Sequence, residues 1–372
     1  MASRTLFFVL FMVFIVVMLA LDLGVFHKKD HVIKIKEAAI WTGVWIVLAM
    51  LFGILLRFRA EWIHGITDLE SLMDYAGSNG IASLIPATAD YASALEIYRK
   101  EIFNQYLAGY FLEESLSIDN IFVMIMIFVS FGIDKRYYHR ILFWGILGAI
   151  VLRFLFIFLL GAAVSKFSWV LAIFGVILVY SGVKMFVKKD DRAIDTANHP
   201  AVKFASRFFP VTREVHGHDF FIKKETTDTD QCPTSTKSKS SIFNFQFSTY
   251  QMTPLFLVLL VIEFSDIIFA VDSIPAVFSV TTDTFVVYFS NIFAIMGLRS
   301  LFFLLNNVTD KFWLLRYGLG LLLCFIGVKM VGHEFLHLEV STQVSLMVIL
   351  GILVGSILLS LIFPQKKKAI AQ

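Results

Sequence analysis

Nine long apolar runs dominate this sequence and leave few folds open to it. A helix needs about 20 mostly apolar residues to cross the hydrocarbon core of a bilayer. Of the 372 residues, 58% are hydrophobic and 16% are charged, whereas a soluble domain carries about 25% charged residues. We therefore predict an all-α polytopic membrane protein with about nine transmembrane helices. The runs cover 6–26, 38–56, 107–131, 141–163, 168–187, 254–280, 284–305, 312–332 and 343–363.

Basic residues follow alternate runs. They occur in "HKKDHVIKIKE" (27–37), in "IDKRYYHR" (133–140), in "KKDDR" (188–192) and in the C-terminal "PQKKKAIAQ". The segment 57–106, by contrast, holds seven acidic residues against four basic ones. Because short cytoplasmic loops are enriched in Lys and Arg, we predict an N-terminus outside the cell and a cytoplasmic C-terminus.

A polar stretch, 188–250, interrupts the series of apolar runs. Its tract "TTDTDQCPTSTKSKSS" (226–241) is too poor in apolar residues to fold alone. We predict a partly disordered cytoplasmic linker that offers a surface for a cytoplasmic partner, with 208–224 packing on the membrane face. His216, His218 and Asp219 could bind a regulatory metal there, although the pattern favours a solvated polar turn.

The halves on the two sides of this linker resemble each other. In each half one carboxylate precedes another by six residues, an arginine follows in the next run, and a "GVKM" lysine follows in the third. The first group starts outside and the second starts inside, so we predict an inverted 3+3 helix repeat, which is typical of secondary transporters. The predicted divisions are 1–106 with two helices and the acidic segment, 107–187 as the first repeat, 188–250 as the linker, 251–332 as the second repeat, and 333–372 as the last helix with a basic tail.

Four carboxylates lie inside the apolar runs at the matching repeat positions. A lone charge at the bilayer centre costs about 2.5–3.5 kcal/mol on insertion scales, so something must compensate for each. Ion pairs with the matching cations could neutralise the acids one for one, but apolar side chains would hold helices together at a lower desolvation cost. We therefore expect a site that combines ion pairing with ligand binding. The acids are Glu113, Asp119, Asp266 and Asp272, and the intramembrane counter-charges are Arg153, Lys184, Arg299 and Lys329.

Helical spacing refines this site. At 100° per residue, side chains six apart point about 120° away from each other, so the two acids of each half do not share a helix face. Glu263 and Asp266, three apart, do share one. Pro275 lacks the N–H that would bond to the carbonyl of Val271. We therefore expect an interrupted helix with a freed carbonyl beside Asp272, as transporters use to bind cations.

The donors gathered in these motifs are oxygens. The predicted runs place no His beside the acids, and Cys324 lies in a different run. Oxygen donors suit Mg²⁺, Ca²⁺ or Mn²⁺ rather than copper or zinc, and the same carboxylates could carry protons. We expect the four intramembrane acids to be the metal ligands, supported by Glu263, Ser117, Asn120, Ser273 and the carbonyl of Val271.

The motifs "ESLSIDNIFV", "EFSDIIFAVDSIPAVF" and "SNIFAIMGLR" resemble those of the TerC family, in particular its Alx-type members. The resemblance extends to "DLGVFHKK", "KEAAIWTGVWI", "HGHDFF" and both "GVKM" segments. It implies an inner-membrane protein linked to tellurite resistance and, for Alx-type members, to manganese export. It also maps the acidic motif residues of the family onto Glu113, Asp119, Asp266 and Asp272.

Two functions fit these observations. The first is a secondary transporter that exports a hard divalent cation, most simply Mn²⁺, in exchange for protons and without a resident cofactor. The alternative is a membrane scaffold or assembly factor in tellurite or metal stress, in which 188–250 recruits partners and the acids only hold helices. We expect no enzyme, because the sequence has no Walker motif and no serine with a recognisable base. The net charge of +3 gives no reason to expect a nucleic-acid partner.

Overall fold

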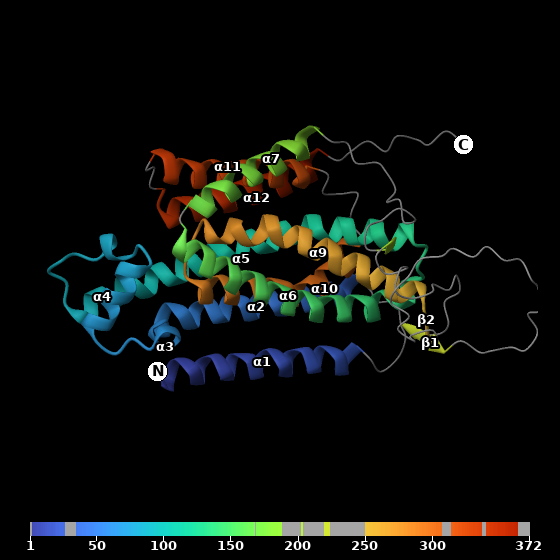
Figure 1. Ribbon diagram of the computed structural model, residues 1–372, viewed down its shortest axis with the longest axis horizontal. Helices are drawn as coiled ribbons and strands as arrows, with labels where there is room; N and C mark the ends of the chain where they lie inside the picture. Colours follow the sequence, from blue (N-terminus) through green and yellow to red (C-terminus); the bar gives the residue numbers. More distant parts are fainter. Residues whose placement is uncertain are drawn as a thin grey trace, which may run out of the picture.

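The computed structural model describes residues 2–26, 35–167, 169–187, 202–203, 219–223, 250–306, 314–336 and 340–363. Within these ranges, each of the nine predicted runs lies in a long helix (Figure 1). The long helices are α1 (Ala2–Phe26), α2 (Ile35–Arg59), α5 (Tyr91–Ser130), α6 (Tyr138–Lys166), α7 (Trp169–Val187), α9 (Pro254–Phe278), α10 (Thr284–Asn306), α11 (Leu315–Leu336) and α12 (Thr342–Ile362). The short elements are α3 (Glu61–His64), α4 (Leu69–Ser78), two 3₁₀ turns (Ala82–Leu84 and Lys135–Tyr137), β1 (Phe221–Lys223) and β2 (Tyr250–Met252).

Seven of the described helices are long and apolar enough to cross a membrane, namely α2, α6, α7, α9, α10, α11 and α12. The apolar part described for α1 is shorter, Thr5–Met18. Helix α5 begins at Tyr91 rather than near 107, and its N-terminal part carries Arg99, Lys100 and Glu101. The architecture is therefore that of an all-α, multi-pass membrane protein, and the count of nine spans stays a prediction.

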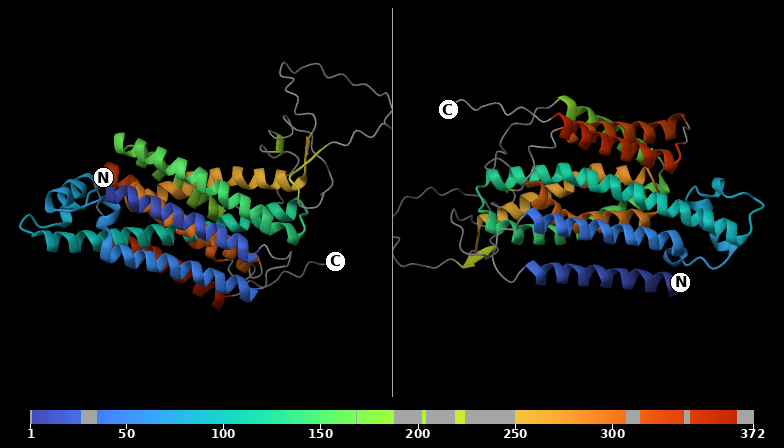
Figure 2. Two further views of the ribbon diagram at one scale, coloured as in Figure 1. Left: turned by 90° about the horizontal axis from the view of Figure 1, so that it is seen from below. Right: turned by 180° about the vertical axis from the view of Figure 1, so that it is seen from behind.

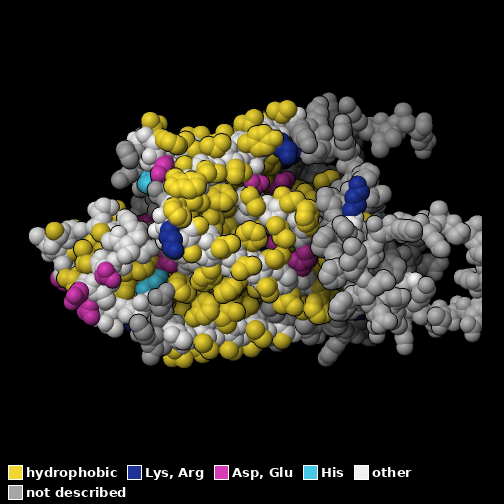
Figure 3. Space-filling view, viewed as in Figure 1, with side chains coloured by type: hydrophobic (Ala, Val, Ile, Leu, Met, Phe, Trp, Pro, Cys, Tyr) yellow, Lys and Arg dark blue, Asp and Glu magenta, His cyan; other side chains and the backbone are white. Residues whose placement is uncertain are grey.

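The long helices run along one direction and separate two ends of the molecule. Helix α4 and the start of α1 lie at one end, whereas strands β1 and β2 lie at the other (Figures 1 and 2). Hydrophobic side chains cover much of the face between these ends (Figure 3). This separation agrees with the predicted alternation of acidic and basic connections, but the side of the membrane that each end faces stays a prediction.

Helices α7 and α11 pack backbone against backbone. A Cβ atom added to Gly175 would lie 2.9 Å from the carbonyl oxygen of Gly327, and one added to Gly182 would lie 2.6 Å from that of Gly320. Residue numbers rise along α7 while those of its partners fall along α11, so the two helices are antiparallel. Helices α5 and α6 each pack against both α9 and α10. An inverted repeat would produce this pairing, although the repeat itself stays a prediction.

Helix α9 is continuous through Pro275. The proline lies in the last turns of the helix, where its missing N–H leaves only one helical hydrogen bond unmade. The predicted interruption beside Asp272 is therefore wrong.

The predicted linker, 188–250, lies largely outside the described residues, and so do His216 and His218. Strand β1, inside the linker, forms a two-stranded antiparallel sheet with β2, which begins at the last residue of the linker, and Ile222 pairs with Gln251. The ring of Phe221 packs 4.5 Å from that of Phe256 on α9. The guanidinium of Arg140 on α6 lies 4.9 Å from the ring of Phe220. The part of 208–224 that is described thus packs against the end of the bundle that we predict to be cytoplasmic.

Candidate cation-binding site

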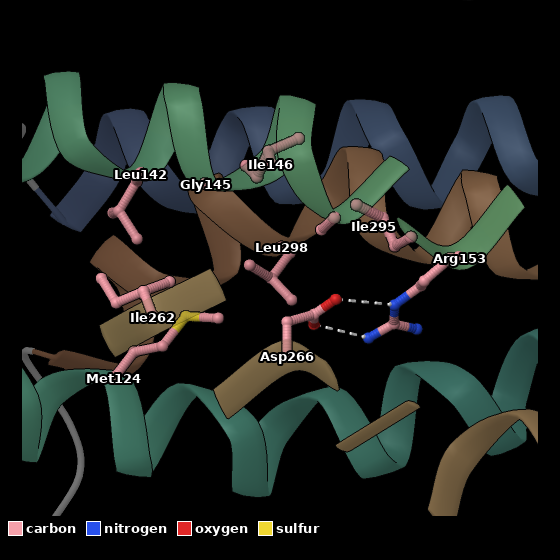
Figure 4. A pocket seen from close by; sticks show the side chains of 10 residues that line it. Met124, Leu142, Gly145, Ile146, Arg153, Ile262, Asp266, Ile295 and Leu298 are labelled. Carbon is pink, nitrogen blue, oxygen red and sulfur yellow. Dashed lines mark hydrogen bonds and ion pairs between the residues drawn. The ribbon is translucent and has the colours of Figure 1, made fainter. Parts of the chain in front are cut away.

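Arg153 on α6 joins two of the predicted acids. Its side chain is fully buried, and Nη1 donates to Oε1 of Glu113 on α5. Nη2 lies 3.1 Å from Oδ1 of Asp266 on α9, and Nε lies 3.5 Å from its Oδ2 (Figure 4). Nη1 also lies 3.3 Å from Oδ1 of Asn291 on α10. One guanidinium therefore connects four helices and pairs with one carboxylate from each half.

Little space remains beside this Arg153 cluster. The adjoining cavity, between Arg153, Asp266 and apolar side chains such as Leu298 and Ile262, has a volume of about 10 Å³, which is no larger than one water molecule needs. Glu113 is fully buried, and among the described residues its Oε2 has no hydrogen-bond partner. In this conformation Glu113 and Asp266 hold helices together, and the cluster has no room for a hydrated cation.

Asp119 and Asp272 line a second, larger cavity of about 400 Å³ between α5, α7, α9 and α11. Ser181 on α7 donates to Oδ1 of Asp272 over 3.2 Å. As the six-residue spacing predicts, Asp119 faces this cavity while Glu113 faces Arg153. The polar and charged residues that line the cavity are Asp119, Asn120, Ser181, Lys184, Asp272, Ser273 and Arg316.

The chemistry of this acidic cavity suits a cation that keeps part of its water. It offers one carboxylate from each half and the neutral oxygens of Asn120, Ser181 and Ser273. The described residues contain no group of three or more His, Cys, Asp or Glu side chains arranged to hold a metal ion. A hard cation bound by the two carboxylates would therefore complete its coordination with water molecules.

The other predicted supporting residues, Ser117, Val271 and Glu263, do not line the acidic cavity. Ser117 is fully buried and does not line it. Val271 is exposed on the surface of α9. The carboxylate of Glu263 lies against Gly148 of α6, where a Cβ atom would collide with it. Glu263 therefore faces α6, as Asp266 does, which confirms that the three-residue spacing puts both on one side of α9.

The four predicted counter-charges do not pair with the four acids one for one. Arg153 serves two acids, while Nη1 of Arg299 lies 3.2 Å from Nε2 of His139. Lys329 donates to the carbonyl of Ser279 over 3.0 Å and to Oγ of Ser345 over 2.9 Å. Of the predicted cations, Lys184 lines the acidic cavity. The acids and counter-charges do not pair one for one because the matching positions of the two halves face different neighbours in this conformation.

Three polar residues of these two sites escaped the sequence analysis, namely Asn291, Ser181 and Arg316. Asn291 and Ser181 are neutral and lie in apolar runs, so neither gave a charge signal. Arg316 lies near the beginning of a run, where a basic residue is ordinary because it can reach the interface.

A further buried polar cluster lies away from both sites and joins α3, α4, α5 and the α9–α10 connection. Nε2 of His64 lies 2.7 Å from Oδ2 of Asp283, and its Nδ1 lies 2.6 Å from the hydroxyl of Tyr98. Tyr75 donates to Asp283 as well. Burial alone would raise the pKa of Asp283, but the charge of His64 and the hydrogen bonds from His64 and Tyr75 outweigh it and lower that pKa to about 2.

Comparison with known proteins places the chain in a family. Residues 98–368 match the model of the integral membrane protein TerC family. The chain is 38% identical over 354 residues to an uncharacterized membrane protein, STKORF319, of Myxococcus xanthus, covering 95% of this chain and 91% of that protein. It is 36% identical to the putative membrane-bound redox modulator Alx of Escherichia coli (strain K12), with 94% and 92% covered, and 32% identical to the tellurium resistance protein TerC of Serratia marcescens, with 95% of each covered. No solved structure matches the chain. The chain belongs to the integral membrane protein TerC family, as its sequence motifs predicted.

Proposed function

We propose that this protein is a secondary transporter that exports a hard divalent cation, with Mn²⁺ as the expected cargo. The observation that carries the proposal is the acidic cavity, in which Asp119 from one half and Asp272 from the other face a common space between membrane helices. Two carboxylates on an apolar, membrane-spanning scaffold are costly, and a transported cation would offset that cost.

The division of the acids supports a transport site of this kind. Arg153 already neutralises much of the charge of Glu113 and Asp266, so these acids serve as a framework. Asp119 and Asp272 have room for water and for an ion. Mn²⁺ is favoured over Mg²⁺ and Ca²⁺ by the resemblance to Alx-type motifs, and the oxygen donors support the class of hard divalent cations.

The remaining parts of the proposal concern topology and coupling. We infer nine spans with an inverted 3+3 repeat, an inner-membrane location, an outer N-terminus and a cytoplasmic C-terminus. Export of a divalent cation against an inside-negative potential costs about 2 × 2.3 kcal/mol per 100 mV. Exchange for entering protons would supply that free energy, and the protein would act without a resident cofactor and without enzymatic chemistry.

The metal content of cells that lack their other manganese exporters tests this proposal. The strains carry empty vector, the wild-type protein, Asp119→Asn or Asp272→Asn at equal membrane abundance. Asp134→Asn is the control, because Asp134 is an exposed acid in the α5–α6 connection. We expect the wild type and the control to lower cellular manganese, and the two cavity variants not to. Cavity variants that export like the wild type would contradict the site.

A membrane scaffold remains the second candidate, and the Arg153 cluster favours it, because two of the four acids do hold helices. The names of two relatives, a redox modulator and a tellurium resistance protein, would then describe the process that the scaffold serves. Deleting 226–241 separates the two functions. A scaffold that recruits partners through the linker loses function, whereas a transporter keeps most of its activity.

A further inference from the structure

The acidic cavity is lined by basic side chains as well as by carboxylates. Its described lining carries two carboxylates, Asp119 and Asp272, and two basic side chains, Lys184 and Arg316. With all four groups in their usual ionised forms, their charges cancel. A divalent cation that entered without displacing a basic group would leave two excess positive charges between membrane helices, where uncompensated charge is costly.

The ammonium of Lys184 is the basic group best placed to move toward the cavity carboxylates or away from them. Asp272 lies within electrostatic range of Lys184, yet no ion pair within 4.0 Å joins Lys184 to any described carboxylate. The side chain of Lys184 is exposed in the described structure, and a lysine ammonium sits on a flexible four-carbon chain. The ammonium can therefore approach Asp272 or withdraw without breaking a bond seen here.

The matching lysine of the second half behaves differently. Lys329 stands two residues after Gly327, as Lys184 stands two residues after Gly182. The ammonium of Lys329 is held by the carbonyl of Ser279 and by Ser345, away from the lining of the acidic cavity. Of this matched pair, only Lys184 is available to the two carboxylates.

The backbone around Lys184 is nevertheless fixed. Gly182 packs against the carbonyl oxygen of Gly320 on α11, which holds the α7 backbone at the cavity wall. The hydroxyl of Ser181 binds Oδ1 of Asp272 over 3.2 Å and leaves Oδ2 for another partner. A fixed backbone with a mobile ammonium is the arrangement that a tethered competitor requires.

We propose that Lys184 is a tethered counter-ion that competes with the divalent cargo for the carboxylates of the acidic cavity. This inference rests on the proposed function, since it assumes that the cavity binds cargo. Its consequence is that Lys184 weakens cargo binding and speeds cargo release. The cavity thus binds its cargo less tightly than its two carboxylates alone would.

Binding of Mn²⁺ to the purified full-length protein tests the inference, with free Mn²⁺ measured by electron paramagnetic resonance. Lys184→Met is compared with the wild type, with Lys184→Arg, which keeps the charge, and with Lys166→Met, which removes an exposed charge from the last turn of α6. We expect Lys184→Met to bind Mn²⁺ about ten-fold more tightly, because one positive charge near the site is gone. Lys184→Arg and Lys166→Met should stay within about two-fold of the wild type, since neither changes the charge beside the carboxylates.

Release supplies a second measurement. Proteoliposomes that contain Lys184→Met should release preloaded Mn²⁺ more slowly than those with wild-type protein. If the wild type binds Mn²⁺ and Lys184→Met binds it equally or more weakly, the counter-ion role is overturned while the transport proposal stands. If neither protein binds Mn²⁺, the transport proposal itself fails, and the counter-ion role with it.

Discussion

Glu113 and Asp266 match each other in the two halves of the sequence, as do Asp119 and Asp272, yet the two pairs lie in different surroundings. Glu113 and Asp266 are buried and share the guanidinium of Arg153 beside almost no free volume. Asp119 and Asp272 face a cavity of about 400 Å³. Residues of one chemical type, six positions apart on the same helices, thus divide into a structural pair and a pair open to a ligand.

The difference shows what a charge inside a membrane protein can be used for. A buried ion pair is weak evidence for net stabilisation, because desolvation of the charges offsets their attraction, but removing one partner is strongly destabilising. A carboxylate beside a cavity keeps water or an ion as its partner and can exchange it. Stability measurements should therefore respond strongly at the Arg153 cluster and weakly at the carboxylates of the acidic cavity.

The largest expected effect comes from Arg153→Met. This change leaves Glu113 and Asp266 buried without their cation, which costs about 3–5 kcal/mol of unfolding free energy. Thermal unfolding of the purified protein would show it. Adding Glu113→Gln and Asp266→Asn to the same chain should recover much of the loss, because no unpaired charge then remains. An unchanged melting temperature for Arg153→Met alone would refute the structural role of the cluster.

The wall of the acidic cavity gives the next effect. In Gly182→Ala the new Cβ would lie 2.6 Å from both Sγ of Cys324 and the carbonyl oxygen of Gly320. Separating α7 from α11 to accommodate it costs about 1–3 kcal/mol. The matched control is Gly351→Ala on α12, where nothing lies within 4 Å of the new atom. Equal melting temperatures for the two variants would contradict the close packing of α7 on α11.

A third buried carboxylate, Asp283, extends the comparison to a site with a histidine partner. Its pKa is lowered to about 2 in the folded protein, below its value in an unfolded chain, near 3.8. The ionised carboxylate of Asp283 therefore contributes about 2 kcal/mol to the free energy of unfolding. This contribution is present above about pH 4 and is lost as the pH falls through about 2. The free energy of unfolding of Asp283→Asn should lack this dependence. A variant and a wild type that lose stability in parallel over that interval would rule out the contribution.

The smallest effect on stability is expected for Asp272→Asn. The amide oxygen can still accept the hydrogen bond from Ser181, and the cavity admits water, so the free energy of unfolding should change by less than about 1 kcal/mol. Binding of Mn²⁺ should nevertheless be lost. A loss of stability as large as that of Arg153→Met would show that Asp272 is also structural.

Much of the fold could be predicted from the sequence, because the signals that set it are local. Length and apolar composition determine where the membrane helices lie, and within the described residues each of the nine predicted runs overlaps a long helix. The family was likewise evident from short motifs around the acids, and the match over 98–368 confirms it. Helical periodicity also predicted correctly that Glu113 and Asp119 face different neighbours.

The tertiary structure decided which partner each charge meets. Arg153 and Asp266 are 113 positions apart in the chain, and no local pattern specifies that one guanidinium serves both Asp266 and Glu113. Nor does any pattern say that Lys329 binds the carbonyl of Ser279 while Lys184 lines a cavity. The sequence by itself determined the membrane helices and the acids they carry. The packing of those helices, which depends on contacts between distant residues, decided which acids pair with Arg153 and which line a cavity.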